Sequence, residues 1–115
     1  MGFLTTHILD TAQGKPANGI QIQLYSIGTQ RELVKTLISN DDGRTDEQLL
    51  SESEFRAGTW ELVFKVAGYF SNAGLETDQP PFLDEITLRF NTSRDDHYHV
   101  PLLVSPWSYS TYRGS

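Results

Sequence analysis

The chain has 115 residues, of which 37% are hydrophobic and 11% aromatic, and this length and apolar content favour one compact domain over residues 1–115. Its formal net charge is -6 and it contains no cysteine, so nucleic-acid binding is disfavoured, while disulfides, thiolate metal sites and a thiol nucleophile are excluded. No apolar stretch approaches the ~20 residues needed to cross a bilayer, and the first residues are not a signal-peptide core, so we expect a cytoplasmic protein that does not bind membranes.

Alternation of apolar and polar residues, which marks a half-buried strand, is the dominant pattern. In chain order it predicts strands over residues 4–9, 20–25, 33–38, 59–66, 86–90, 97–104 and 108–113, with a weaker one over 48–53. The pattern is clearest in the central strand, where Trp60, Leu62 and Phe64 share one face. Turn-forming residues separate the strands. Strands at such short intervals favour a sandwich of two sheets.

Two segments depart from the alternation. Residues 67–73 lack it and carry two adjacent aromatic side chains, so we expect a short helix there. Pro101 lies inside the apolar strand 97–104, where a missing N–H is tolerated at a sheet edge, at a bulge, or where that position faces away from a neighbour. We therefore expect an edge or a bulge at Pro101.

The three histidines, His7, His97 and His99, all lie in predicted strands. Histidine is the side chain most easily poised as a general base near neutral pH, although a single histidine on a strand is more often a polar surface residue. Because side chains i and i+2 point the same way, His97 and His99 share one face. The opposite face is the better core face and carries Tyr98, Val100, Leu102 and Val104. The histidine face is therefore expected to look toward solvent or a partner subunit.

Arg44 follows the predicted turn over residues 40–43, close to three aspartates. One interpretation is a surface ion pair, worth ~0 to 1 kcal/mol and without functional meaning. The other is a planar donor to a carbonyl or enolate-like oxygen, a task that the fixed fork of arginine suits better than lysine. Taken alone, the position of Arg44 favours the ion pair.

A metal site is the competing hypothesis for the histidines. His97 and His99 form an i, i+2 pair that chelates a metal in some strands, and His7 would be the third ligand of an open, catalytic site. The spacing of histidines and carboxylates does not favour it, because His-x-His alone is a weak signal. A serine triad is disfavoured as well, since the chain has no Gly-x-Ser-x-Gly motif.

The C-terminal run from His97 to Ser115, which ends in Tyr-Arg-Gly-Ser, resembles the signature of the transthyretin-related 5-hydroxyisourate hydrolases. Three further segments resemble this family in the same order: Leu-Thr-Thr-His-Ile-Leu-Asp at 4–10, Asp-Gly-Arg-Thr at 42–45 and Gly-Tyr-Phe at 68–70. Together they cover nearly the whole chain. The carrier transthyretin resembles the same fold but lacks the Tyr-Arg-Gly-Ser ending and these histidines, which favours the hydrolase branch.

The resemblance implies a transthyretin-like two-sheet sandwich, in agreement with the strand pattern: all-β, about eight strands and one short helix. It implies a homotetramer, a dimer of dimers, with active sites in a central channel. The implied reaction is the hydrolysis of 5-hydroxyisourate to 2-oxo-4-hydroxy-4-carboxy-5-ureidoimidazoline in urate degradation. Water opens a ring amide, and neither a cofactor nor a metal is needed.

Carried over position by position, the resemblance assigns catalysis to His7, Arg44, His99 and Ser115, and substrate binding to Tyr112, Arg113 and Gly114. We expect His99, with His7 nearby, to activate the water, while the arginines orient the substrate and stabilise charge on its oxygens. His97 is interpreted as an orienting or structural residue. Ser115 would act through its hydroxyl or its carboxylate. Two other classes stay open: a carrier of an apolar aromatic ligand, and a structural sandwich module that is monomeric.

Overall fold

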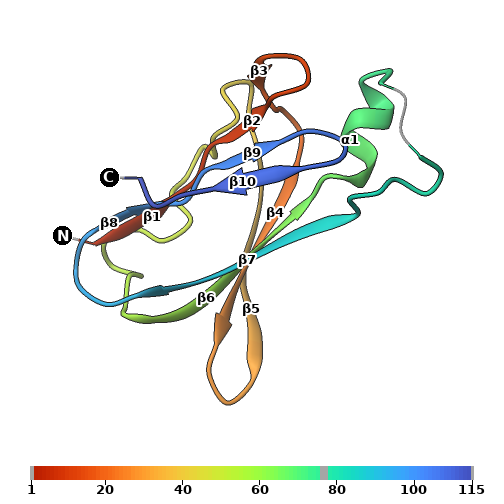
Figure 1. Ribbon diagram of the computed structural model, residues 1–115. Helices are drawn as coiled ribbons and strands as arrows, with labels where there is room; N and C mark the ends of the chain where they lie inside the picture. The colour runs from red at the N-terminus through yellow and green to blue at the C-terminus, as the bar shows by residue number, and fades with distance from the viewer. Residues whose placement is uncertain (1, 76–77, 115) are drawn as a thin grey trace.

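The computed structural model describes residues 2–75 and 78–114. Within these residues the chain forms ten strands and one helix (Figure 1). In chain order they are β1 (Phe3–Thr5), β2 (Ile8–Asp10), β3 (Lys15–Pro16), β4 (Gln21–Ile27), β5 (Arg31–Ile38), β6 (Gly58–Lys65), α1 (Ala67–Asn72), β7 (Glu85–Thr92), β8 (His97–His99), β9 (Leu102–Val104) and β10 (Tyr109–Thr111). The expected helix and the all-β class are confirmed.

The strands form two layers. One layer is an antiparallel sheet in the order β5-β4-β6-β7, and the other contains the sheet β10-β9-β2-β3 and the parallel pair β1-β8. Thr5 is opposite His99 in the pair β1-β8, and Ile8 is opposite Leu102 in the pair β2-β9, so both pairs share one register. The described strands number eight if β1 with β2, and β8 with β9, are each counted as one interrupted strand. Figure 1 shows β2, β9 and β10 crossing the strands of the other layer.

The strands predicted over residues 4–9 and 97–104 are both interrupted beside Pro101, between β1 and β2 and between β8 and β9. This interruption corrects two predictions. Residues 4–9 and 97–104 are not continuous strands, and Pro101 is at neither an edge nor a bulge, because β9 lies between β10 and β2 and the register is the same on both sides. Val100 donates its N–H to the Thr5 carbonyl at 2.9 Å, while the Thr6 hydroxyl donates to the Val100 carbonyl at 2.6 Å. A side chain thus supplies a hydrogen bond where the ladder is broken.

The core lies between the two layers. Its fully buried side chains come from both sheets and include Ile8, Ile22, Leu24, Trp60, Leu62, Phe64 and Leu102. The predicted core face of residues 98–104 is confirmed, since all four of its apolar side chains are buried. The central strand is more buried than the alternation predicts. Glu61, on its outer face, is buried because Arg31 and Arg89 pair with its two carboxylate oxygens at 2.9 and 2.7 Å.

Two further differences concern short elements. The weaker strand predicted over 48–53 is wrong: this segment has a single bridge, from Leu50 to Leu4, followed by a turn. The two-residue strand β3 lies between residues 9 and 20, where no strand was predicted. In the described part of the chain no helix is long and apolar enough to cross a membrane.

Candidate active site

A cleft of about 410 Å³ opens beside β1 and β8. Three segments that are distant in the sequence line it. They contribute Thr5 and Thr6, then Arg44, Thr45, Asp46, Glu47 and Gln48, and finally His97 and His99. The parallel register of β1 with β8 therefore joins the first and last of these segments, and the segment after the Arg44 turn closes the cleft from the side.

Thr5 holds two of the three imidazoles. Its hydroxyl oxygen lies 2.8 Å from Nε2 of His97 and 2.8 Å from Nδ1 of His99. The ring of His97 is also stacked on Phe3, with centroids 4.0 Å apart and an interplanar angle of 18°. The two rings are thus fixed by hydrogen bonds, and His97 by stacking as well. Thr5 was not among the predicted site residues, because nothing local to it shows a contact with residues more than 90 positions away.

A tight turn positions Arg44. The side-chain oxygen of Asn40 accepts the N–H groups of Asp42 and Arg44 at 2.9 and 3.1 Å. Gly43 has a φ of 74°, and a Cβ at this position would lie 2.4 Å from the Ile8 carbonyl, so only glycine fits. The Gly43 carbonyl accepts the Ile8 N–H at 2.8 Å. The turn therefore docks directly on β2, next to His7.

Arg44 is not a surface ion pair: within the described residues it makes no salt bridge with a carboxylate. Its charge acts on the histidines instead. Burial first, and then the charge of Arg44, lower the pKa of His99 below its ordinary value. The same two causes, in the same order, lower the pKa of His7, although Asp42 opposes them. Both imidazoles are therefore neutral near pH 7, the form that accepts a proton.

The C-terminal segment docks on His99. Gly114 donates its N–H to the His99 carbonyl at 2.7 Å, and a Cβ on Gly114 would lie 3.0 Å from Cδ2 of the same histidine. The chain end is thus docked on β8 as far as Gly114. Ser115 lies outside the described residues.

Tyr112 and Arg113 do not line the cleft. They border a second hollow of about 360 Å³ between β7 and β10. The Arg113 guanidinium lies over the Tyr98 ring, 4.4 Å from its centroid, and 3.2 Å from Asp96. Tyr112 is 59% exposed. Within one subunit the structure therefore brings together His99, Arg44, His7 and Gly114, but it places Tyr112 and Arg113 on another surface.

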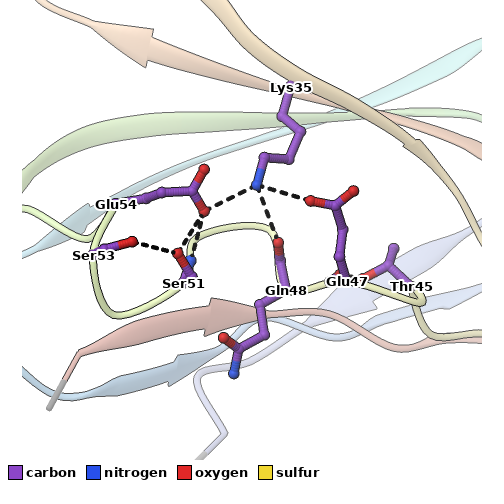
Figure 2. Close-up of polar contacts among 7 residues, drawn as sticks. All are labelled: Lys35, Thr45, Glu47, Gln48, Ser51, Ser53 and Glu54. Carbon is purple, nitrogen blue, oxygen red and sulfur yellow. Dashed lines mark hydrogen bonds and ion pairs between the residues drawn. The ribbon is translucent and has the colours of Figure 1, made fainter.

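Lys35 anchors the segment that walls the cleft (Figure 2). Its ammonium group reaches from β5 to Glu47 at 3.3 Å, to the Gln48 carbonyl at 3.3 Å and to Glu54 at 3.0 Å. Glu54 is also held by Ser51, whose backbone N–H donates at 2.8 Å. The hydrogen bonds from Ser51 and then Lys35 lower the pKa of Glu54 to about 2. A lysine from the other sheet thus fixes the position of this wall.

The histidines are arranged as a hydrogen-bonded pair and not as a chelate. Across residues 2–75 and 78–114, no group of three or more His, Cys, Asp or Glu side chains is placed to hold a metal ion. The ring nitrogens that His97 and His99 turn toward one another are both engaged by Thr5. This geometry suits proton transfer by a neutral imidazole next to a fixed positive charge.

Comparison with known proteins matches a family model and many similar chains, of which three are described. The model, described as the HIUase/Transthyretin family, matches residues 4–114. A 5-hydroxyisourate hydrolase from Pseudomonas aeruginosa is 53% identical over 100% of this chain and 93% of its own length. The crystal structure of an (S)-allantoin synthase has a TM-score of 0.93 and 49% identity over 99% of this chain, which spans 44% of that protein. The structure of the Klebsiella pneumoniae 5-hydroxyisourate hydrolase has a TM-score of 0.81 and 34% identity, with 100% of both chains covered.

Proposed function

The chain belongs to the HIUase/Transthyretin family, and we propose that it hydrolyses 5-hydroxyisourate in urate degradation, using water to open a ring amide. The product is 2-oxo-4-hydroxy-4-carboxy-5-ureidoimidazoline. One observation carries the proposal: a cleft holds the neutral imidazole of His99 next to the guanidinium of Arg44. Hydrolases that are about half identical over the full chain support the same substrate.

Amide hydrolysis needs a base for the attacking water and donors for the oxyanion that develops. His99 takes a proton from the water as its oxygen bonds to the ring carbonyl carbon. Arg44 donates hydrogen bonds to the carbonyl oxygen, on which negative charge accumulates. When the C–N bond breaks, the imidazolium returns the proton to the departing nitrogen. His7, also neutral and beside Arg44, shares the task of holding the water.

The roles of the chain end extend the proposal to a homotetramer. Gly114 supports the substrate site through its contact with His99, and Ser115 contributes its hydroxyl or carboxylate. Tyr112 and Arg113 face away from the cleft of their own subunit, so we assign them to the substrate through an assembly in which a neighbouring copy presents them. The outermost strands β7 and β10 and exposed aromatic residues, Trp107, Tyr109 and Tyr112, provide surfaces for such an assembly.

The oligomeric state tests this part. Light scattering after size-exclusion chromatography should give the mass of four subunits, with the active sites in a central channel. A monomeric mass would support a structural module and would remove Tyr112 and Arg113 from the proposed site.

A ligand carrier of the same fold is the second candidate. The family description includes transthyretin, so the fold alone does not separate a carrier from a hydrolase. The hollow between β7 and β10 favours a carrier, because apolar and aromatic side chains border this hollow: Leu88, Phe90, Tyr98 and Val100. A carrier would bind an apolar aromatic molecule there without chemical change.

The deciding experiment follows the ultraviolet decay of freshly generated 5-hydroxyisourate, with and without protein that has been treated with a strong chelator. Fast decay that survives chelation supports a metal-free hydrolase, whereas chelator-sensitive decay supports the three-histidine metal site. No acceleration supports the carrier. His99→Ala and Arg44→Ala should each lose most turnover and keep their oligomeric state. Arg56→Ala, which changes an arginine stacked on Trp60 outside the cleft, is the matched control.

Two wider assignments belong to the same proposal. Residues 1–115 act as one hydrolase domain, since the family match spans residues 4–114 and both sheets contribute to one core. The protein acts in the cytoplasm as a hydrolase that binds neither membranes nor nucleic acid. Fractionation of the source cells, with turnover measured in each fraction, tests the location.

A further inference from the structure

The hydroxyl of Thr5 lies between two imidazole nitrogens, and the mechanism above does not use it. Both distances, to Nε2 of His97 and to Nδ1 of His99, are 2.8 Å. A hydroxyl has one proton, so it donates to one ring and accepts from the other. The two contacts therefore have opposite polarity, and the direction of the proton in Thr5 is coupled to the tautomers of both histidines.

Only one of the two arrangements leaves His99 able to act as a base. If Thr5 donates to His99, Nδ1 carries the lone pair and Nε2 carries the proton, so no ring lone pair is left for water. If Thr5 donates to His97, Nδ1–H of His99 donates to Thr5 and Nε2 keeps its lone pair. Arg44 lines the same cleft as His99, and its charge acts on the ring. A cation favours a lone pair over an N–H on the ring nitrogen that it approaches, and Nε2 is the nitrogen of His99 left for this interaction, because Thr5 engages Nδ1.

We propose that Thr5 is a positioning residue that sets the tautomer of His99: it donates its proton to Nε2 of His97, accepts Nδ1–H of His99, and leaves Nε2 of His99 unprotonated for the attacking water. This inference rests on the proposed function for its catalytic consequence, but the tautomer itself does not depend on turnover. In this arrangement His97, whose ring is held in place by Thr5 and by stacking on Phe3, is the acceptor.

The same contact strengthens during the reaction. When Nε2 of His99 takes a proton from water, the ring becomes an imidazolium, and its Nδ1–H then donates a charge-assisted hydrogen bond to Thr5. This hydrogen bond is stronger when His99 is an imidazolium, so it stabilises the transition state more than the bound substrate and lowers the activation barrier. Loss of the hydroxyl should therefore reduce kcat and leave KM nearly unchanged.

Two variants of the full chain separate the hydroxyl from the shape of the side chain. Thr5→Val keeps the β-branched shape in β1 and removes the hydroxyl, whereas Thr5→Ser keeps the hydroxyl. We expect kcat of Thr5→Val to fall by about 10- to 100-fold with little change in KM, a share of the 10²- to 10⁴-fold that a positioned base contributes. Thr5→Ser should stay within about threefold of the original protein, because its hydroxyl makes the same hydrogen bonds.

The tautomers are measured directly from the ¹⁵N chemical shifts of the imidazole nitrogens in the unsubstituted protein. The expected result is His99 protonated at Nδ1 and unprotonated at Nε2, with the fraction of this tautomer reduced in Thr5→Val and kept in Thr5→Ser. A neutral His99 protonated at Nε2 would overturn the proposal, as would a folded Thr5→Val with unchanged kcat. If the expected tautomer is found but 5-hydroxyisourate is not hydrolysed, the assignment of Thr5 stands and the proposed function fails.

Discussion

Gly114→Ala tests whether the docked C-terminal segment supports catalysis. A Cβ on residue 114 would lie 3.0 Å from Cδ2 and 3.3 Å from Cβ of His99. Contacts this short require a shift of a few tenths of an ångström, either of the imidazole or of the C-terminal segment. The first shift disturbs the 2.8 Å hydrogen bond between His99 and Thr5, and the second weakens the 2.7 Å bond from the Gly114 N–H to the His99 carbonyl.

The size of the effect follows from these two outcomes. Forcing a side chain about 30° from its rotamer costs about 0.5–1.5 kcal/mol, and losing one hydrogen bond costs about 1 kcal/mol. Either loss, if it acts in the transition state, corresponds to about a two- to twelvefold fall in kcat/KM. Global stability should change little, because the segment lies outside the core, and ~1 kcal/mol would lower Tm by only about 4 °C.

The assay measures kcat/KM from 5-hydroxyisourate decay, together with Tm by calorimetry. Gly68→Ala is the matched control, since Gly68 lies in α1 and a Cβ there would meet only Asn72, at 4.0 Å. It should keep full activity. If Gly114→Ala keeps the original kcat/KM while its fold is intact, the docked position of the segment does not matter for catalysis, and residues 112–114 leave the proposed site.

Lys35→Met should lower the free energy of unfolding by about 1–2 kcal/mol, since three hydrogen bonds to partly exposed partners are lost. It should also lower kcat/KM, because the wall of the cleft is held less firmly. Urea unfolding measures the first effect and turnover the second. Lys65→Met, which breaks an exposed pair on the edge of the sheet, is the control and should cost less than about 1 kcal/mol. The pH profile should reflect the lowered pKa values of His7 and His99. Because both rings stay neutral to a lower pH than an ordinary histidine, the acid limb of kcat/KM should lie below about pH 6.5. In Arg44→Gln the residual activity should show this limb at higher pH, because a repelling charge is gone; an unmoved limb would show that Arg44 does not act on the titrating histidine.

Local patterns predicted the parts of this protein that depend on local physics. Alternation placed every described strand except β3, although it joined β1 to β2 and β8 to β9. It also identified the buried face of residues 98–104, because the side-chain period of a strand is fixed by the backbone. The break in alternation after residue 66 predicted the helix. The pattern failed at Glu61, whose carboxylate on the outer face pairs with Arg89 from the neighbouring strand β7 and with Arg31 from β5, one strand further away. Such contacts depend on the order of the strands in the sheet.

The candidate site was predicted only through the resemblance to a family. Nothing local to His7, Arg44 and His99 shows that they lie near each other, and Arg44 taken alone favoured a surface ion pair. Thr5 and Lys35 could not be predicted at all, because both act through contacts across the fold. Because the hydrophobic pattern of a strand repeats every two residues, it indicates which face is buried but not which residue of a distant strand lies opposite.

The interruption at Pro101 explains why the site forms where it does. Proline cannot donate to the ladder, so the paired strands are anchored on either side of it, by Val100 donating to Thr5 and by Leu102 donating to the His7 carbonyl at 2.9 Å. His7 therefore lies at the break, with its backbone held toward β9. On the opposite edge of the same strand, Ile8 donates its N–H to the carbonyl of Gly43 in the turn before Arg44. The strand break at Pro101 and the turn at Gly43 therefore both lie beside His7. This arrangement brings the guanidinium of Arg44 next to imidazoles from both ends of the chain.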